Sequence, residues 1–120
     1  MFVVEKREGE RVAIFRLTGG IDLMRMMALR DTIKQVVGEG CLQVILDCRR
    51  LRSINEKSLE ILTDTVCRLR RLDGDVLLLA LPPAVEDTFR AAGVYAFFEH
   101  FPGERQARRA CRLKRLAMAG

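Results

Sequence analysis

The chain has 120 residues, of which 49% are hydrophobic and 31% charged, and its formal net charge is +5. These values predict one folded domain, residues 1–120 with a core over about 2–115, and argue against a disordered chain. No apolar run approaches the roughly 20 residues of a membrane-spanning helix, and no signal-peptide pattern is present, so we expect a cytoplasmic protein. The basic excess permits an acidic partner but does not require one.

The residues that usually bind metals or carry out catalysis are few and scattered. The four cysteines form no CxxC pair, and His100 has only Glu99 as an acidic neighbour, so we expect buried, reduced thiols and no metal or cofactor. The sequence also lacks a Gly-rich phosphate loop and a Cys/His pair at catalytic spacing. We therefore expect a protein that is not an enzyme.

The first predicted elements form a hairpin followed by a helix. Strands at 2–4 and 11–17 flank a charged corner, and Thr18-Gly19-Gly20 is expected to end the second strand. A helix then runs from about residue 23 to Gly38, since apolar residues recur at steps of three and four on one face. These residues are Met26, Leu29, Ile33 and Val36.

The central unit is a strand, a corner and a helix between residues 44 and 72. An apolar run at 44–46 closed by Asp47 predicts a buried strand, and residues 48–55 are expected to form a polar corner. Leu59, Leu62, Val66 and Leu69 then mark one face of a helix.

The remaining residues predict a second buried strand and two more helices. Residues 76–81 are continuously apolar, which is typical of a strand covered on both faces. A short helix at 84–92, an edge strand within 95–101 and a helix from 104 to about 118 are expected to follow. This order indicates an α/β fold with a mixed β-sheet of about four to five strands and helices packed on it.

Several short motifs, in this order, resemble the STAS domains, the fold of bacterial anti-sigma factor antagonists. The resemblance covers roughly residues 2–115 and implies a non-catalytic protein-binding module that regulates transcription by partner switching in a bacterial cell. It also implies that the partner is an anti-sigma factor of the serine-kinase type. The motifs are Gly19-Gly20-Ile21-Asp22-Leu23, Leu46-Asp47-Cys48, Leu51-Arg52-Ser53-Ile54, Asn55-Glu56-Lys57-Ser58-Leu59, Pro83-Ala84-Val85 and Ala92-Gly93-Val94.

The chain departs from the family at the phosphorylation motif. In the family the kinase phosphorylates the second serine of Asp-Ser-Ser-Gly, and the resemblance places Asn55, Glu56, Lys57 and Ser58 at these positions. Lysine cannot accept phosphate in that reaction, so the resemblance implies that the usual switch is absent. Asp22, which matches an acidic residue near that motif in the family, is retained.

Three interpretations of this corner remain open. In a structural one, Ser53 and Glu56 form a capping box and Asp22 pairs with Lys57 at the surface. In a functional one, the corner binds a protein, together with the loop at 21–23 and Thr63 and Asp64 of the helix. The residues expected at this interface are Asp22, Asn55, Glu56, Lys57, Ser58 and Glu60. In the third, Ser58 is a shifted phosphoacceptor.

Other classes of function also remain open. Some STAS proteins resemble accessory subunits that bind a transport ATPase, and another relative is a multimeric scaffold, so the sequence leaves homo-oligomer formation open. The last helix carries a basic face that would suit nucleic acid, although we expect it to be a solvated face with Ala107, Ala110, Cys111 and Met118 packed on the sheet. Its basic residues are Arg105, Arg108, Arg109, Arg112 and Arg115.

Overall fold

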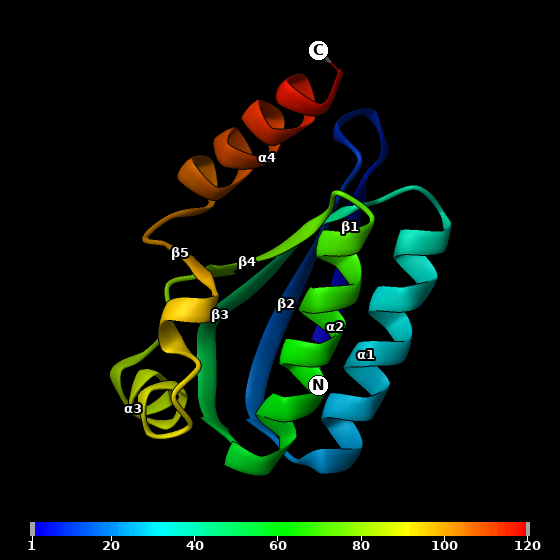
Figure 1. The fold of residues 1–120 in the computed structure, drawn as a ribbon. Coiled ribbons are helices and arrows are strands. Elements are labelled where there is room, and N and C mark those ends of the chain that lie inside the picture. The colour runs from blue at the N-terminus through cyan, green and yellow to red at the C-terminus, as the bar shows by residue number, and fades with distance from the viewer. Residues whose placement is uncertain (1, 120) are drawn as a thin grey trace.

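The sheet positions every other element of the fold. The structure is a computed structural model that describes residues 2–119, without the side chains of Glu8, Met118 and Ala119. Five strands pair in chain order in one mixed sheet, in which only the first pair is antiparallel (Figure 1). The strands are β1 (Phe2–Arg7), β2 (Val12–Ile21), β3 (Gln43–Ile54), β4 (Asp75–Leu79) and β5 (Glu99–Phe101). The predicted α/β fold with a mixed sheet is confirmed.

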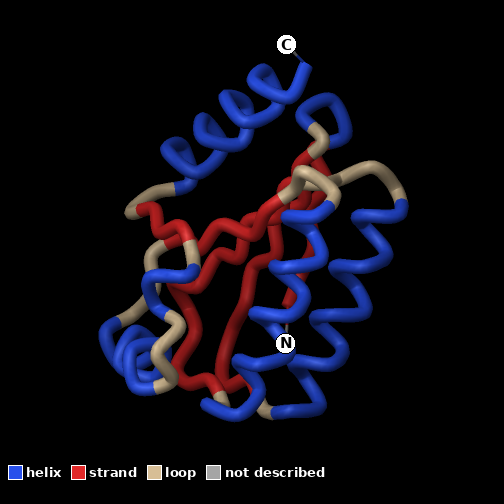
Figure 2. Tube along the Cα trace, viewed as in Figure 1, coloured by secondary structure: helices blue, strands red, loops and turns tan. Residues whose placement is uncertain are grey.

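Four helices cover the two faces of the sheet unequally. Three of them pack on one face and the fourth crosses part of the other (Figures 1 and 2). The first three are α1 (Leu23–Gly38), α2 (Leu59–Arg71) and α3 (Pro83–Ala91), and the fourth is α4 (Glu104–Ala119). Single 3₁₀ turns are found at η1 (Glu8–Glu10), η2 (Glu56–Ser58) and η3 (Tyr95–Phe97). No helix among the described residues is both long and apolar enough to span a membrane.

The core has a large and a small part because the strands alternate their side chains between the two faces. Ala13, Phe15 and Leu17 of β2 face the three-helix layer, whereas Val12 and Ile14 face α4 through Ala107 and Cys111. The predicted apolar faces of α1 and α2 are confirmed, since all eight of their predicted core residues are buried. Beyond the part that α4 covers, no other helix of residues 2–119 packs on the second face of the sheet (Figures 1 and 2).

Three strands are longer than the sequence predicted. β1 continues into the expected charged corner and ends at Arg7. β2 continues through Thr18-Gly19-Gly20 to Ile21, and β3 continues through the expected polar corner to Ile54. Shifts of register between Arg16 and Thr18, and again between Gly19 and Gly20, interrupt the alternation that a strand prediction relies on. The expected edge strand is also shorter, because residues 95–97 form η3 and only 99–101 pair with β4.

Candidate functional site

The predicted corner lies where the parallel strands β2 and β3 end side by side. The backbone N–H of Asn55, after β3, donates to the carbonyl of Ile21, at the end of β2, over 2.8 Å. α1 and η2, which leads into α2, begin at this same edge of the sheet (Figure 1). The corner therefore joins two helix starts through one backbone hydrogen bond.

Side chains from the corner cap both starts. Asp22 Oδ1 accepts from the backbone N–H of Arg25 over 2.8 Å, and Arg25 Nη1 donates to the carbonyl of Gly20 over 2.8 Å. Asn55 Oδ1 accepts from the backbone N–H of Ser58 over 3.1 Å. These bonds satisfy donors that a helix start otherwise leaves unpaired, so the corner is held in one conformation.

The capping box predicted from Ser53 and Glu56 is wrong. Ser53 lies within β3, paired with Gly20, and Asn55 is the residue that caps η2. The added length of β3 moves the helix start two residues beyond Ser53. Asp22 and Lys57 also form no ion pair in the structure of residues 2–119, since the Asp22 carboxylate caps α1.

Five of the six predicted interface residues are exposed: Asp22, Asn55, Glu56, Lys57 and Glu60. Ser58 is the exception, since it has 0% exposure and its hydroxyl donates to the carbonyl of Asn55 over 2.7 Å. Ser58 therefore belongs to the folded framework of the corner and does not present its hydroxyl to a kinase. Thr63 is half-buried and Asp64 exposed farther along α2.

Sequence reasoning missed an apolar patch beside this corner. Leu23, Met24 and Met27 of α1 are 50%, 80% and 40% exposed, and α1 contacts η2. The signal was present in the sequence, because none of the three falls on the apolar face of Met26 and Leu29. We call these three residues the α1 patch.

Two shallow depressions flank the corner. One, of about 420 Å³, lies between the helix starts and includes Asp22, Arg25, Ser53 and Asn55 in its lining. The other, of about 410 Å³, runs from the start of α2 to the end of α3 and includes Lys57 and Glu60. Within residues 2–119 no three His, Cys, Asp or Glu side chains converge to hold a metal ion.

The remaining candidate residues lie away from the corner. His100 Nε2 is 2.7 Å from the carbonyl of Tyr95, and its ring stacks on the Tyr95 ring at 4.0 Å between centroids. On α4, Arg108 pairs with Glu10 and Arg115 donates to the carbonyl of Gly9, so part of the predicted basic face is bound to η1.

Comparison with known proteins gives the family of this fold. The family model of the STAS domain matches residues 3–107, which is most of the chain. The chain belongs to the STAS domain family.

Three solved structures share the fold of this STAS domain closely. The anti-sigma factor antagonist SpoIIAA in its unphosphorylated form is 20% identical with a TM-score of 0.77, and the match covers 92% of this chain and 96% of that one.

The other two structures are equally complete matches. An anti-sigma factor antagonist from Mycobacterium paratuberculosis is 24% identical with a TM-score of 0.77, and 93% of each chain is covered. The Bacillus cell fate determinant SpoIIAA in its phosphorylated form is 18% identical with a TM-score of 0.70, and the match covers 92% of this chain and 99% of that one. The STAS domain described here is thus matched over nearly its full length.

Proposed function

We propose that this STAS domain is a non-catalytic module that binds a protein partner through the corner where α1 and α2 begin. One observation carries the proposal: the α1 patch lies beside an exposed row of polar residues on a corner that is rigidly capped. A buried apolar centre with a polar rim is the usual anatomy of a protein interface. Methionine adapts well to such a surface because its side chain is unbranched and flexible.

The partner we propose is an anti-sigma factor of the serine-kinase type, in the bacterial cytoplasm. Two of the structures that share this fold are described as anti-sigma factor antagonists, and that description is the support for this partner class. The charges of the corner add a constraint. Lys57 follows Glu56 directly and precedes Glu60 by three residues, so the corner carries both signs of charge. The partner surface must therefore present both an acidic and a basic group.

Binding would not be switched by phosphorylation at this corner. Lys57 carries an amine at the position to which the family resemblance assigns the phosphoserine. The neighbouring hydroxyl of Ser58 is buried and already donates a hydrogen bond, so transferring phosphate to it would first require the start of α2 to open. Binding would therefore be constitutive, and the concentrations of the two proteins relative to their dissociation constant would set how much of the partner is occupied.

A tagged pull-down from the native cell tests the proposal, with the partner identified by mass spectrometry. Lys57→Glu should lose the partner, whereas Lys34→Glu, the same charge change on an exposed position far along α1, should retain it.

Recovery of a transport ATPase in place of an anti-sigma factor would change the proposed class of partner and leave the proposed binding surface as it is. A large homomeric particle on size exclusion would instead assign the scaffold role. Retention of the same partner by Lys57→Glu would contradict the proposed corner.

Intact-mass analysis after incubation with the captured kinase and ATP tests the absence of the switch. We expect no added phosphate on the native chain. A stoichiometric phosphate on Ser58 would show that the start of α2 opens and that the switch has moved by one residue.

A further inference from the structure

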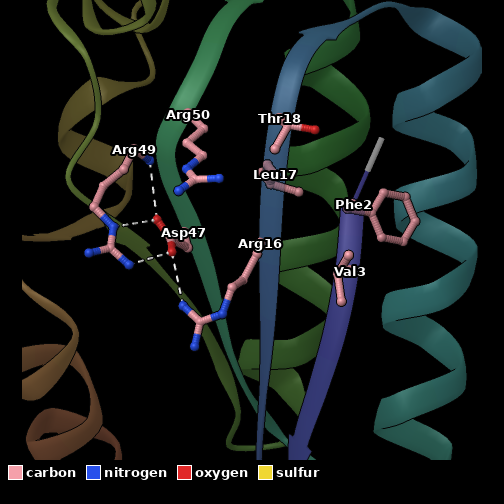
Figure 3. A pocket seen from close by; sticks show the side chains of 8 residues that line it. All are labelled: Phe2, Val3, Arg16, Leu17, Thr18, Asp47, Arg49 and Arg50. Atoms are coloured by element: carbon pink, nitrogen blue, oxygen red, sulfur yellow. Dashed lines mark hydrogen bonds and ion pairs between the residues drawn. The ribbon is translucent and has the colours of Figure 1, made fainter.

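A third depression lies on the open face of the sheet, away from the corner. It has a volume of about 690 Å³, within the range of small-molecule sites, and spans β1, β2 and β3 beyond the part covered by α4 (Figure 3). We call it the sheet-face hollow. The residues that line it are Phe2, Val3, Arg16, Leu17, Thr18, Asp47, Arg49 and Arg50.

A β-bulge gathers the charged residues of this hollow. Asp47 pairs with Arg16 and Arg50 with Thr18, so β3 advances three residues while β2 advances two. The extra residue cancels one alternation, and Asp47 and Arg50 therefore extend to the same face of the sheet. Figure 3 shows Arg49 and Arg50 both on the side of the hollow. A regular strand would have turned Arg50 toward the helix layer.

Asp47 accepts hydrogen bonds from two of the arginines through both of its carboxylate oxygens. Its side chain is 8% exposed, and it accepts from Arg16 Nη1 over 3.0 Å and from Arg49 Nε and Nη2 over 3.0 and 2.8 Å. Arg16 also donates to Glu104 over 2.8 Å and lies 3.6 Å from Glu5. These two arginines thus already have carboxylate partners, and Arg49 keeps only the donors of Nη1 and one of Nη2 for another group.

Arg50 supplies the charge that is left over. Its guanidinium makes no hydrogen bond or ion pair with any residue that the structure describes, and its side chain lies between β3 and β2 beside the hollow (Figure 3). The local charges are those of Arg7, Arg16, Arg49 and Arg50 against Glu5, Asp47 and Glu104, with Arg7 bound to Glu5. Among these described residues one positive charge is uncompensated, which matches a ligand group with a single negative charge.

The opposite side of the hollow is apolar. Val3 of β1 is 67% exposed on this face, a large fraction for a valine, whereas the side chains of Phe2 and Leu17, which border the hollow, pack into the helix layer on the other face. An exposed apolar side chain across from a free guanidinium suits a ligand with one charged and one apolar end.

We propose that the sheet-face hollow binds a small organic monocarboxylic acid. Its carboxylate pairs with the guanidinium of Arg50 and the remaining donors of Arg49, and its apolar body covers Val3. Guanidinium and carboxylate match in shape as well as charge, since both are planar and can form two parallel hydrogen bonds. The site is independent of the proposed partner corner, which shares no lining residue with it.

Titration of the ¹⁵N-labelled protein with octanoate, followed by amide chemical shifts, tests this site. Octanoate should shift amides at residues 2–3, 16–18 and 47–50 with a saturable isotherm. Acetate, which lacks the apolar body, and 1-octanol, which lacks the charge, should each bind at least tenfold more weakly. Arg50→Gln should weaken octanoate at least tenfold, whereas Arg52→Gln, the same change at an exposed arginine outside the lining, should leave it unchanged.

Three results would overturn the proposal: no saturable shift with octanoate up to several millimolar, equal binding by Arg50→Gln and the native chain, or equal binding of octanoate and 1-octanol. The first would show that the hollow is only solvated. The second would place the ligand elsewhere, and the third would show an apolar site without anion recognition. Amide spectra of both variants, which change exposed side chains, verify that the fold is retained.

Discussion

Asp47 lies nearly buried on the open face of the sheet, bound by Arg16 and Arg49. Burial on its own raises the pKa of Asp47, but the hydrogen bonds from Arg49 and Arg16 outweigh it and hold that pKa below its ordinary value. A carboxylate with a lowered folded-state pKa stabilises the fold above its unfolded pKa. That stability is lost as the pH falls through the folded pKa.

The first prediction therefore concerns Asp47→Asn. At neutral pH the substitution should lower the free energy of unfolding by about 1–3 kcal/mol, because it leaves charged donors without their acceptor. It should also make the free energy of unfolding fall less steeply between about pH 5 and pH 2.

Urea denaturation across this range measures both effects. Asp64→Asn, at an exposed pair with Arg68, is the control and should change stability by less than about 1 kcal/mol. Equal pH profiles for Asp47→Asn and the native chain would contradict the prediction.

The second prediction concerns Gly74, in the turn between α2 and β4. A Cβ at this position would lie 2.2 Å from the carbonyl oxygen of Leu42, which is backbone and cannot rotate away. Gly74→Ala should therefore destabilise the protein by about 1–3 kcal/mol or more. Gly38→Ala is the control, since nothing lies within 4 Å of its Cβ position, and it should be neutral or stabilising by up to about 1 kcal/mol. Equal stability of the two variants would show that the turn relaxes freely.

At the scale of elements, regular periodicity was predictable and irregular backbone was not. The helices α1 and α2 could be predicted because their buried residues follow the helical repeat without a break. β3 was cut short because Arg49, Arg50, Arg52 and Ser53 are exposed and two register shifts interrupt its alternation. A bulge depends on how two strands pair, and that pairing cannot be predicted from the sequence of one strand alone.

The end of β3 gives the third prediction. Since Asn55 caps η2, Asn55→Ala should lower the free energy of unfolding by about 1 kcal/mol. Ser53→Ala should have a much smaller effect, because Ser53 is a strand residue. Chemical denaturation of the two variants decides between the caps. A larger loss for Ser53→Ala would restore the capping box that the sequence suggested.

At the scale of the whole molecule, burial separates three of the cysteines from the fourth. Cys41, Cys48 and Cys111 are buried, whereas Cys67, on α2, is exposed, so the expectation of four buried thiols was wrong for Cys67. Burial raises the pKa of the Cys111 thiol to about 12 and raises that of Cys48 still further. Thiols that are both buried and protonated react slowly with alkylating reagents.

The fourth prediction follows from that division. Brief treatment of the native protein with iodoacetamide should add one label, at Cys67, and treatment in denaturant should add four. Peptide mass spectrometry locates the label, and Cys67→Ser should leave the native protein unlabelled. Rapid labelling of Cys111 in the native state would show that α4 separates readily from the sheet.

The candidate site was predictable as a place on the chain but not as a surface. The ordered motifs of the sequence located the corner and five residues that the structure exposes there. Burial of Ser58 depends on how η2 packs against α1 and α3, which are distant parts of the chain, whereas the exposure of Met24 was readable from the helical repeat. The bulge that brings Arg50 into the sheet-face hollow likewise depends on contacts between distant parts of the chain.

Isothermal titration of the partner recovered by pull-down tests the central claim, that the corner with the α1 patch binds a protein. Met24→Asp and Lys57→Glu should each weaken binding at least tenfold, because one places a charge in the apolar centre and the other reverses the charge of the rim. Leu72→Asp is the matched control, since Leu72 is 54% exposed just after the other end of α2. The account predicts native affinity for Leu72→Asp alone. Native affinity for Met24→Asp and Lys57→Glu would contradict it and place the interface on another face.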